Sequence, residues 1–142
     1  MLTEPALGLG PGSEELISQV LGTLTLPTPP GLAELADGQQ LLLAGLDFRV
    51  VHAPGHTPGC VMLLTSTSEG PVALTGDVLF ASSIGRTDLP GGSMADMVRT
   101  LATRVLGLDD ASWVLPGHGP QTTMARERAQ NPYLQPSFLE SV

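Results

Sequence analysis

Three short motifs rich in glycine and proline interrupt the apolar runs of this chain, and each carries a residue that can bind a metal ion. They are HAPGHTPG at residues 52–59, TGD at 75–77 and LPGHGP at 115–120. Each motif follows or ends a run typical of a β-strand, so His56, Asp77 and His118 are expected on tight loops at strand ends. Because a rigid scaffold can aim such loops at one point, the motifs predict a strand-rich fold with a metal site where the loops meet.

The length and composition are those of one globular domain. The chain has 142 residues, of which 42% are hydrophobic, and this is enough apolar material for a packed core. Six arginines, no lysine and 14 acidic residues give a formal net charge of −8. Such an acidic chain is a poor match for a phosphate backbone, so the composition argues against a nucleic-acid partner.

The sequence also favours a cytoplasmic protein. Cys60 is the single cysteine and cannot form an internal disulfide, and the N-terminus lacks the basic, apolar and small-residue order of a secretory signal. The longest apolar runs, such as 41–44 and 61–64, are far shorter than the roughly 20 residues that span a bilayer. We therefore expect no membrane span.

The middle of the chain has a β pattern. Runs 40–43 and 48–52 are expected to form a hairpin, and runs 61–65 and 72–74 flank a turn of Ser, Thr, Glu and Gly. A further short strand is expected at 113–115, with Trp113 in the core. The prediction is therefore a sheet whose strands lead into the three motifs.

Helices are expected before and after these strands. Ser13 is the expected N-cap of a short helix, and the prolines at 26–31 predict an extended connector. Ser93 should start a longer helix, because Asp96 completes a capping-box pattern and apolar residues recur at helical spacing up to Gly107. The side chains expected to face the core are Leu16, Ile17 and Val20 in the first helix and Met94, Met97, Val98, Leu101 and Val105 in the longer one. A polar helix is expected at 122–130, and a loosely specified tail after it.

The three motifs suit a hydrolytic zinc site. Such a site needs neutral imidazoles and a carboxylate at about 2.0–2.2 Å from the metal, with one position left for water. Flanking Gly and Pro residues would hold His56 and His118 on rigid loops. Asp77 follows an apolar strand, where an isolated carboxylate is costly unless a cation or a donor meets it. Each motif alone could equally be a surface turn, and the metal hypothesis depends on the three together.

These motifs resemble those of the metallo-β-lactamase-fold hydrolases, and within them the short bacterial glyoxalase II-like (hydroxyacylglutathione hydrolase-like) branch. They match the second, third and fourth metal motifs of that family in order and approximate spacing. The segments GDVLF at 76–80, GRTDLPGG at 85–92 and NPYL at 131–134 are similar to further parts of the same branch. The first family motif, His-x-His-x-Asp-His, is absent from the chain.

The resemblance implies an α/β (α+β) fold, the C-terminal βα half of a four-layer αβ/βα sandwich. Residues 1–142 would then be one metallo-β-lactamase-like domain that is incomplete at its N-terminal side. We expect the chain to begin inside this domain, and the sequence leaves open whether Met1 is an internal methionine, a shortened start or a misplaced one.

The resemblance also assigns residue roles. His56 corresponds to a ligand of the first metal, Asp77 to the catalytic carboxylate that bridges two metals, and His118 to a ligand of the second metal. A complete domain would hold two Zn²⁺ ions, with iron or manganese as alternatives, and a hydroxide between them would attack a small-molecule thioester. Arg86 could bind a substrate carboxylate, or it could form a structural ion pair with Asp88.

Two alternatives to the thioester hydrolase stay open. One is an iron-dependent persulfide dioxygenase, which shares the fold but needs a single iron. The other is a non-catalytic half-domain that pairs with a second copy or with a separate N-terminal half, because a sheet layer without its neighbour exposes an apolar face. With the first motif absent, we expect little or no hydrolysis by the chain alone.

Two further residues have simpler interpretations. His52 is expected to pack or form a hydrogen bond at the end of its strand, not to bind metal. Cys60 enters an apolar strand without a partner base, so it is expected to be a buried, unreactive thiol.

Overall fold

The structure is a computed structural model that describes residues 28–141. Residues from Leu35 onward belong to one compact unit, and residues 28–34 contain neither helix nor strand. The absence of regular structure agrees with the extended connector expected at 26–31, as far as that segment is described. The helix expected from Ser13 lies outside the described residues.

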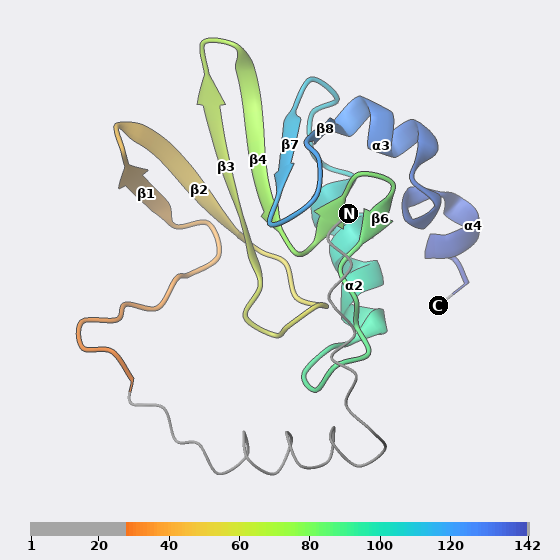
Figure 1. The fold of residues 1–142 in the computed structure, drawn as a ribbon, viewed down its shortest axis with the longest axis horizontal. Helices are drawn as coiled ribbons and strands as arrows, with labels where there is room; N and C mark the ends of the chain where they lie inside the picture. Colours follow the sequence, from red (N-terminus) through yellow and green to blue (C-terminus); the bar gives the residue numbers. More distant parts are fainter. Residues whose placement is uncertain (1–27, 142) are drawn as a thin grey trace, which may run out of the picture. The chain divides into compact units, whose positions relative to one another are not determined.

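Six strands form the main sheet in the order β1-β2-β3-β4-β7-β8 (Figure 1). Their bounds are Gln40–Leu43, Leu46–His52, Val61–Thr67, Gly70–Gly76, Trp113–Pro116 and Thr122–Thr123. All neighbours are antiparallel except β4 and β7, which run parallel with Gly76 opposite Pro116. Parallel strands end at the same edge of a sheet, so the loops that carry Asp77 and His118 start side by side.

Helical segments follow the strands and supply the rest of the core. Their bounds are Met94–Thr100 for α2, Leu101–Val105 for the π-helix η1, Met124–Gln130 for α3, Pro132–Leu134 for the 3₁₀-helix η2 and Pro136–Leu139 for α4. The core joins buried residues of one sheet face, such as Met62 and Val114, to Met97, Leu101 and Val105 of α2 and η1. This face of the sheet is therefore the one that the longer helix covers.

The longer helix begins as predicted, but its first apolar residue is not buried. Ser93 is the N-cap and its Oγ accepts the backbone N–H of Asp96 at 3.2 Å. Met97 and Leu101 are fully buried, whereas Met94 is 38% exposed. Met94 lies in the first turn, beyond the edge of the surface that α2 covers, so its predicted burial was wrong.

The opposite face of the sheet carries exposed apolar side chains. Leu43 and Leu46 form a register pair, Val72 and Trp113 form another, and residues paired in this way point to the same side of a sheet. Leu43 is 47%, Leu46 37% and Trp113 41% exposed. The prediction that Trp113 is core was wrong, because its side chain points away from the face that α2 covers.

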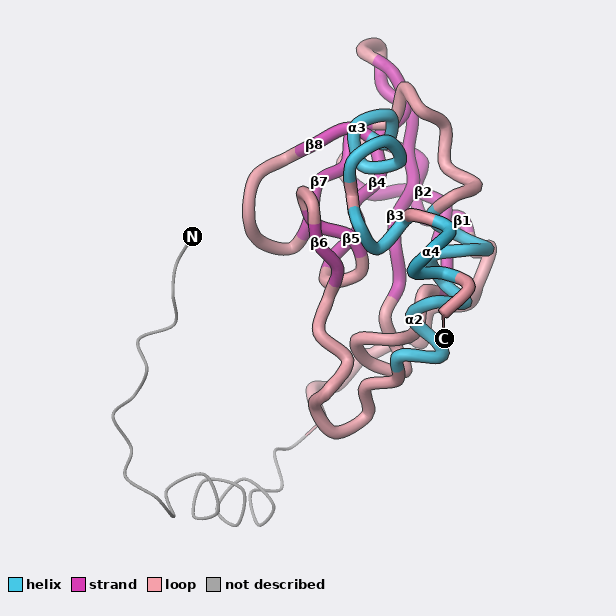
Figure 2. Tube along the Cα trace, turned by 90° about the vertical axis from the view of Figure 1, so that its right-hand side faces the viewer, coloured by secondary structure: helices cyan, strands magenta, loops and turns pink. Residues whose placement is uncertain are grey.

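Three parts of the fold were not predicted. A two-stranded hairpin of β5 (Leu79–Phe80) and β6 (Ser83–Ile84) lies at the ends of β4 and β7 (Figure 2). The polar helix expected at 122–130 starts two residues later, after β8, with Thr123 as its N-cap. The expected loose tail instead forms η2 and α4, where Tyr133 and Phe138 pack edge to face with ring centroids 5.0 Å apart. Among residues 28–141, no helix has the length and apolar character needed to cross a bilayer.

Candidate metal site

Asp77 lies between two imidazole rings at the edge of the main sheet. Its Oδ2 is 3.5 Å from Nε2 of His56, and its Oδ1 is 3.2 Å from Nδ1 of His118. The structure thus brings together the three residues that the sequence motifs single out. Their role as metal ligands stays a prediction.

Two hydrogen bonds hold the loop of His56 against α2 and its N-cap residue, Ser93. The backbone N–H of Ser93 donates to the carbonyl of Gly55 at 2.8 Å, and Oγ1 of Thr100 donates to the carbonyl of Pro54 at 2.7 Å. Gly55 has φ of +146°, and a Cβ at this position would lie 2.6 Å from Cα of Met97. Only glycine allows both this backbone conformation and this close approach to the helix.

The hydrogen bond of His56 fixes which ring nitrogen faces Asp77. Nδ1 of His56 is 2.8 Å from the backbone carbonyl of Arg86, and a carbonyl can only accept, so Nδ1 carries the proton. In the neutral ring, Nε2 is then an acceptor that faces the carboxylate of Asp77. Two acceptors facing each other are unfavourable unless a cation lies between them or the ring gains a proton.

The position of Asp77 depends on close backbone packing. The backbone N–H of Gly117 donates to the carbonyl of Gly76 at 2.9 Å, which joins the two loops directly. A Cβ on Gly117 would lie 2.6 Å from Oδ1 of Asp77, and a Cβ on Gly85 would overlap the backbone oxygen of Asp77. Gly117 therefore leaves space for the carboxylate of Asp77, and Gly85 leaves space for its backbone carbonyl.

His118 is the most exposed of the three side chains. It is 71% exposed, compared with 35% for Asp77 and 20% for His56. Its imidazole packs against the ring of Phe80, with centroids 4.5 Å apart and planes tilted by 42°. Phe80 and Asp77 are thus the described contacts that orient the imidazole of His118, most of which is exposed to solvent.

The donor set fits a divalent metal, although the described residues supply only part of a coordination shell. Two ligands of a tetrahedral zinc ion are separated by roughly 3.3–3.6 Å, close to the nitrogen–oxygen distances of 3.5 and 3.2 Å at Asp77. Within residues 28–141, no group of three or more His, Cys, Asp and Glu side chains is arranged to hold one ion. Asp77 instead takes part in two pairs, each made of one imidazole and one carboxylate oxygen.

Arg86 forms the ion pair that the sequence offered as its alternative role. Its Nε and Nη2 donate to the two carboxylate oxygens of Asp88 at 2.8 and 2.9 Å. The hydrogen bonds from Arg86 lower the pKa of Asp88 to about 2. The sequence did not indicate the second role of Arg86, whose backbone carbonyl orients His56. Substrate binding by its guanidinium stays a prediction.

His52 forms a hydrogen bond, as its position at a strand end led us to expect. Its Nε2 is 2.8 Å from the carbonyl of Pro58, within the loop that carries His56. Cys60 is partly buried against the core, and its Sγ is 3.1 Å from Oγ1 of Thr57. Both side chains therefore support the loop and do not face Asp77.

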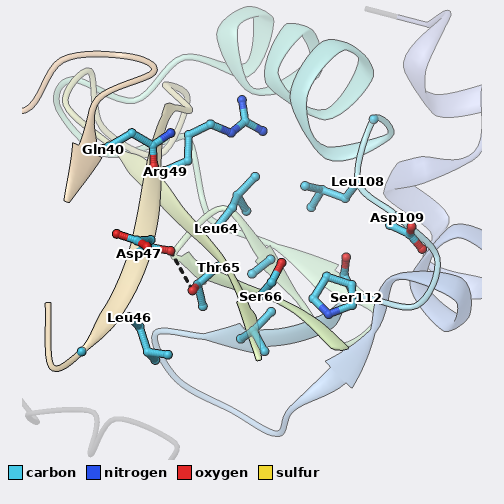
Figure 3. Close-up of a pocket in the computed structure, with 15 residues that line it drawn as sticks. Gln40, Leu46, Asp47, Arg49, Leu64, Thr65, Ser66, Leu108, Asp109 and Ser112 are labelled. Carbon is cyan, nitrogen blue, oxygen red and sulfur yellow. Dashed lines mark hydrogen bonds between the residues drawn. The ribbon is translucent and has the colours of Figure 1, made fainter. Parts of the chain in front are cut away.

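A separate hollow of about 640 Å³ lies over β1–β4 and the segment after η1 (Figure 3). Its lining includes Asp47, Arg49, Leu64, Leu108 and Asp109, and Oγ1 of Thr65 donates to the carbonyl of Asp47 at 2.8 Å there. Neither the residues around Asp77 nor Arg86 lines it. The hollow is consequently not the candidate metal site.

Comparison with known proteins points to one family. The model of the metallo-beta-lactamase superfamily matches residues 5–118. An uncharacterized protein of Mycobacterium tuberculosis is 42% identical over 139 residues, which cover 95% of this chain and 60% of that protein. Hydroxyacylglutathione hydrolase GloC of Haemophilus influenzae is 42% identical over 98 residues, which cover 69% of this chain and 45% of the hydrolase.

A solved structure supports the same fold assignment. The structure of TTHA1623 in a di-iron-bound form superposes with a TM-score of 0.66 at 36% identity, covering 86% of this chain and 58% of that one. The chain thus spans about half to three fifths of the length of the relatives it matches. The likeness extends over most of this chain and over only part of each relative.

Proposed function

The chain is a member of the metallo-β-lactamase superfamily, and we propose that it forms part of a divalent-metal hydrolase that cleaves a thioester of the hydroxyacylglutathione type. The observation that carries this proposal is the placement of His56, whose Nδ1 lies 2.8 Å from the carbonyl of Arg86 while its Nε2 faces the carboxylate of Asp77 at 3.5 Å. A cation between the two groups would turn an unfavourable pair of acceptors into a pair of ligands.

Each residue of the site has a specific part in the proposal. His56 and His118 each present one ring nitrogen, and Asp77 presents one oxygen to each ring, so its carboxylate can bridge two ions. The carbonyl of Arg86 keeps the proton of His56 on Nδ1 and leaves Nε2 available. Bound divalent ions would supply an activated water and polarise the substrate carbonyl.

The thioester is the finer part of the proposal. It is supported by the motifs of residues 52–59, 75–77 and 115–120 and by the likeness to GloC, whose name states hydroxyacylglutathione hydrolysis. Two zinc ions are the metals we propose. The di-iron form of TTHA1623 supports a two-metal site in a related protein without selecting zinc for this one.

We further propose that the remaining ligands come from a segment with the His-x-His-x-Asp-His motif. The described residues lack a group of three or more metal-binding side chains. The sheet face with exposed Leu43, Leu46 and Trp113 would suit contact with such a segment. A second copy of the chain is the competing occupant of this face.

Reconstitution tests the proposal. The chain is mixed with a polypeptide that carries the His-x-His-x-Asp-His motif, and zinc content and hydrolysis of a lactoyl-thiol ester are measured on the same chromatographic peak. The complex should bind two zinc ions and turn over, whereas the chain alone should show little or no activity. Asp77→Asn should abolish turnover, and Glu69→Gln in the exposed β3–β4 turn should not.

Three outcomes would count against this function. Robust turnover that survives Asp77→Asn would place the chemistry elsewhere. A folded complex that neither binds zinc nor hydrolyses the ester would favour the non-catalytic alternative. One iron per complex with oxygen consumption would favour the dioxygenase.

A further inference from the structure

The β5–β6 hairpin touches all three candidate ligands. Asp77 lies two residues before β5, Phe80 in β5 packs against the ring of His118, and the backbone carbonyl of Arg86, two residues after β6, accepts a hydrogen bond from Nδ1 of His56. The hairpin was not predicted from the sequence, and its strands have only two residues each. Such a short hairpin is marginal by itself and needs an external anchor.

That anchor is a buried polar pair from the end of the chain. Glu127 of α3 and Asn131, which follows it, are both 0% exposed. The backbone N–H of Ser82, between β5 and β6, donates to Oε2 of Glu127 at 2.7 Å. Nδ2 of Asn131 is 3.1 Å from the carbonyl of Ser83 and 3.4 Å from that of Phe80.

The pair is itself fully connected. Nδ2 of Asn131 donates to Oε2 of Glu127 at 2.9 Å, and the hydroxyl of Thr122 donates to Oε1 at 2.7 Å. All three described partners of Glu127 are donors, which a carboxylate can satisfy. Removal of the carboxylate would leave buried N–H groups without an acceptor, so the network has a strong preference for one arrangement.

The anchored turn has a backbone conformation that needs such support. Ser82 has φ of +61°, in the left-handed region that non-glycine residues rarely adopt. Its N–H bond to Glu127 and the bonds of Asn131 to the flanking carbonyls hold this conformation. Relaxation of the turn would move Phe80, and with it the ring contact of His118.

We infer that Glu127 and Asn131 are positioning residues for His118, acting through the hairpin and Phe80. Neither side chain has a described contact with the ring of His118, whose described contacts are Asp77 and Phe80. The consequence for metal affinity rests on the proposed function, whereas the orientation of His118 in the metal-free chain does not. The two can therefore be tested separately.

The test uses the imidazole ring protons of His118 in the metal-free chain, observed by NMR. The tilted ring of Phe80, with its centroid 4.5 Å from that of His118, should give these protons a ring-current shift, and Phe80→Leu defines the signal positions in the absence of the Phe80 ring. Glu127→Ala should move the His118 signals toward the Phe80→Leu position. Glu127→Gln should keep the His118 signals near their wild-type positions. The amide oxygen of Gln can accept the hydrogen bonds from the Ser82 N–H and from Nδ2 of Asn131. Its NH₂ group can donate to the Thr122 hydroxyl, which can rotate to accept.

Zinc titration of the same variants gives a second readout. The dissociation constant should rise about 10-fold or more in Glu127→Ala, the range typical of lost outer-shell support, and stay near wild type in Glu127→Gln. Backbone signals of β2 and β3 serve as the folding control. If Glu127→Ala does not fold, Asn131→Ala takes its place, with the same expected shift of His118.

The inference is overturned if His118 keeps its wild-type ring-proton shifts in a folded Glu127→Ala or Asn131→Ala variant. It is also overturned if Glu127→Gln loses these shifts as completely as Glu127→Ala, because the acceptor would then not be the cause. If the complex with the motif-bearing polypeptide binds no zinc while the metal-free chain shows the expected His118 shifts, the proposed function is contradicted and the positioning role stays supported.

Discussion

At the scale of single residues, the geometry around Asp77 shows how backbone groups position side chains. The carbonyl of Arg86 sets the proton position of His56, and Gly117 leaves space for the carboxylate oxygen of Asp77. The net charge of −8 does not indicate this local arrangement. The site is defined by which lone pairs face each other, not by the overall charge.

The ion pair next to the site makes a prediction for pH. Because hydrogen bonds from Arg86 lower the pKa of Asp88 from 3.8 to about 2, the ion pair should stabilise the fold above pH 4 and lose this contribution as the pH falls from about 4 to 2. In Arg86→Ala, the titration midpoint of Asp88, followed by NMR, should rise toward 3.8. A midpoint that stays near 2 would show that Arg86 is not the cause.

At the scale of elements, α2 and η1 act as the support on which the loop of His56 rests. Met97 packs against Gly55, and Thr100 binds the carbonyl of Pro54, so the same helix supplies core and site. The helix also changes from α to π geometry at Leu101, which is fully buried. Stability and site geometry should therefore change together when this helix is altered.

Leu101 and Met94 provide a matched test of this helix. Leu101→Ala should lower the free energy of unfolding by about 2–5 kcal/mol, because a fully buried side chain leaves a cavity. Met94→Ala, at a position that is 38% exposed, should change it by less than about 0.5 kcal/mol. Urea denaturation measures both values, and equal losses would contradict the observed burial.

The sequence predicted those elements whose signals are local. Ser93 and Asp96 gave the start of α2, and the first hairpin was found from alternation and its turn. The β5–β6 hairpin was missed because its strands are too short to show alternation. Glu127 was interpreted only as part of a polar helix, because its hydrogen-bond partner Ser82 lies 45 residues away in the sequence. Met94 and Trp113 were wrongly predicted to be buried. Their hydrophobic character does not indicate which face of the helix or of the sheet another element covers.

At the scale of the whole molecule, the proposed complementation depends on two features, the exposed apolar side chains of the sheet and the two imidazoles beside Asp77. The described residues offer Asp77 two imidazoles, and Leu43, Leu46 and Trp113 on the sheet face away from α2 are 37–47% exposed. The absent first motif had led us to expect an exposed apolar face on the sheet. The sequence could not give the arrangement of the three ligands, which depends on the parallel pairing of β4 and β7.

This face should decide association with a complementing segment. Replacing Leu46 and Trp113 together by Ser should weaken binding of the motif-bearing polypeptide by at least about 10-fold, since apolar burial drives such contacts. Leu42→Ser is the control, because Leu42 is 73% exposed but points to the other side of β1. Equal affinity of all variants in calorimetry would show that the complementing segment binds elsewhere.

The most direct test of the metal site uses the fact that the chain has only three histidines. Zinc is titrated into a sample of the protein in which the histidines are labelled with ¹⁵N. The imidazole nitrogens of His52, His56 and His118 are followed by NMR. We predict that Nε2 of His56 and a ring nitrogen of His118 shift on binding, that His52 does not, and that Asp77→Asn weakens both shifts. A saturable shift of His52 alone, or no shift at any of the three rings at millimolar zinc, would contradict the account.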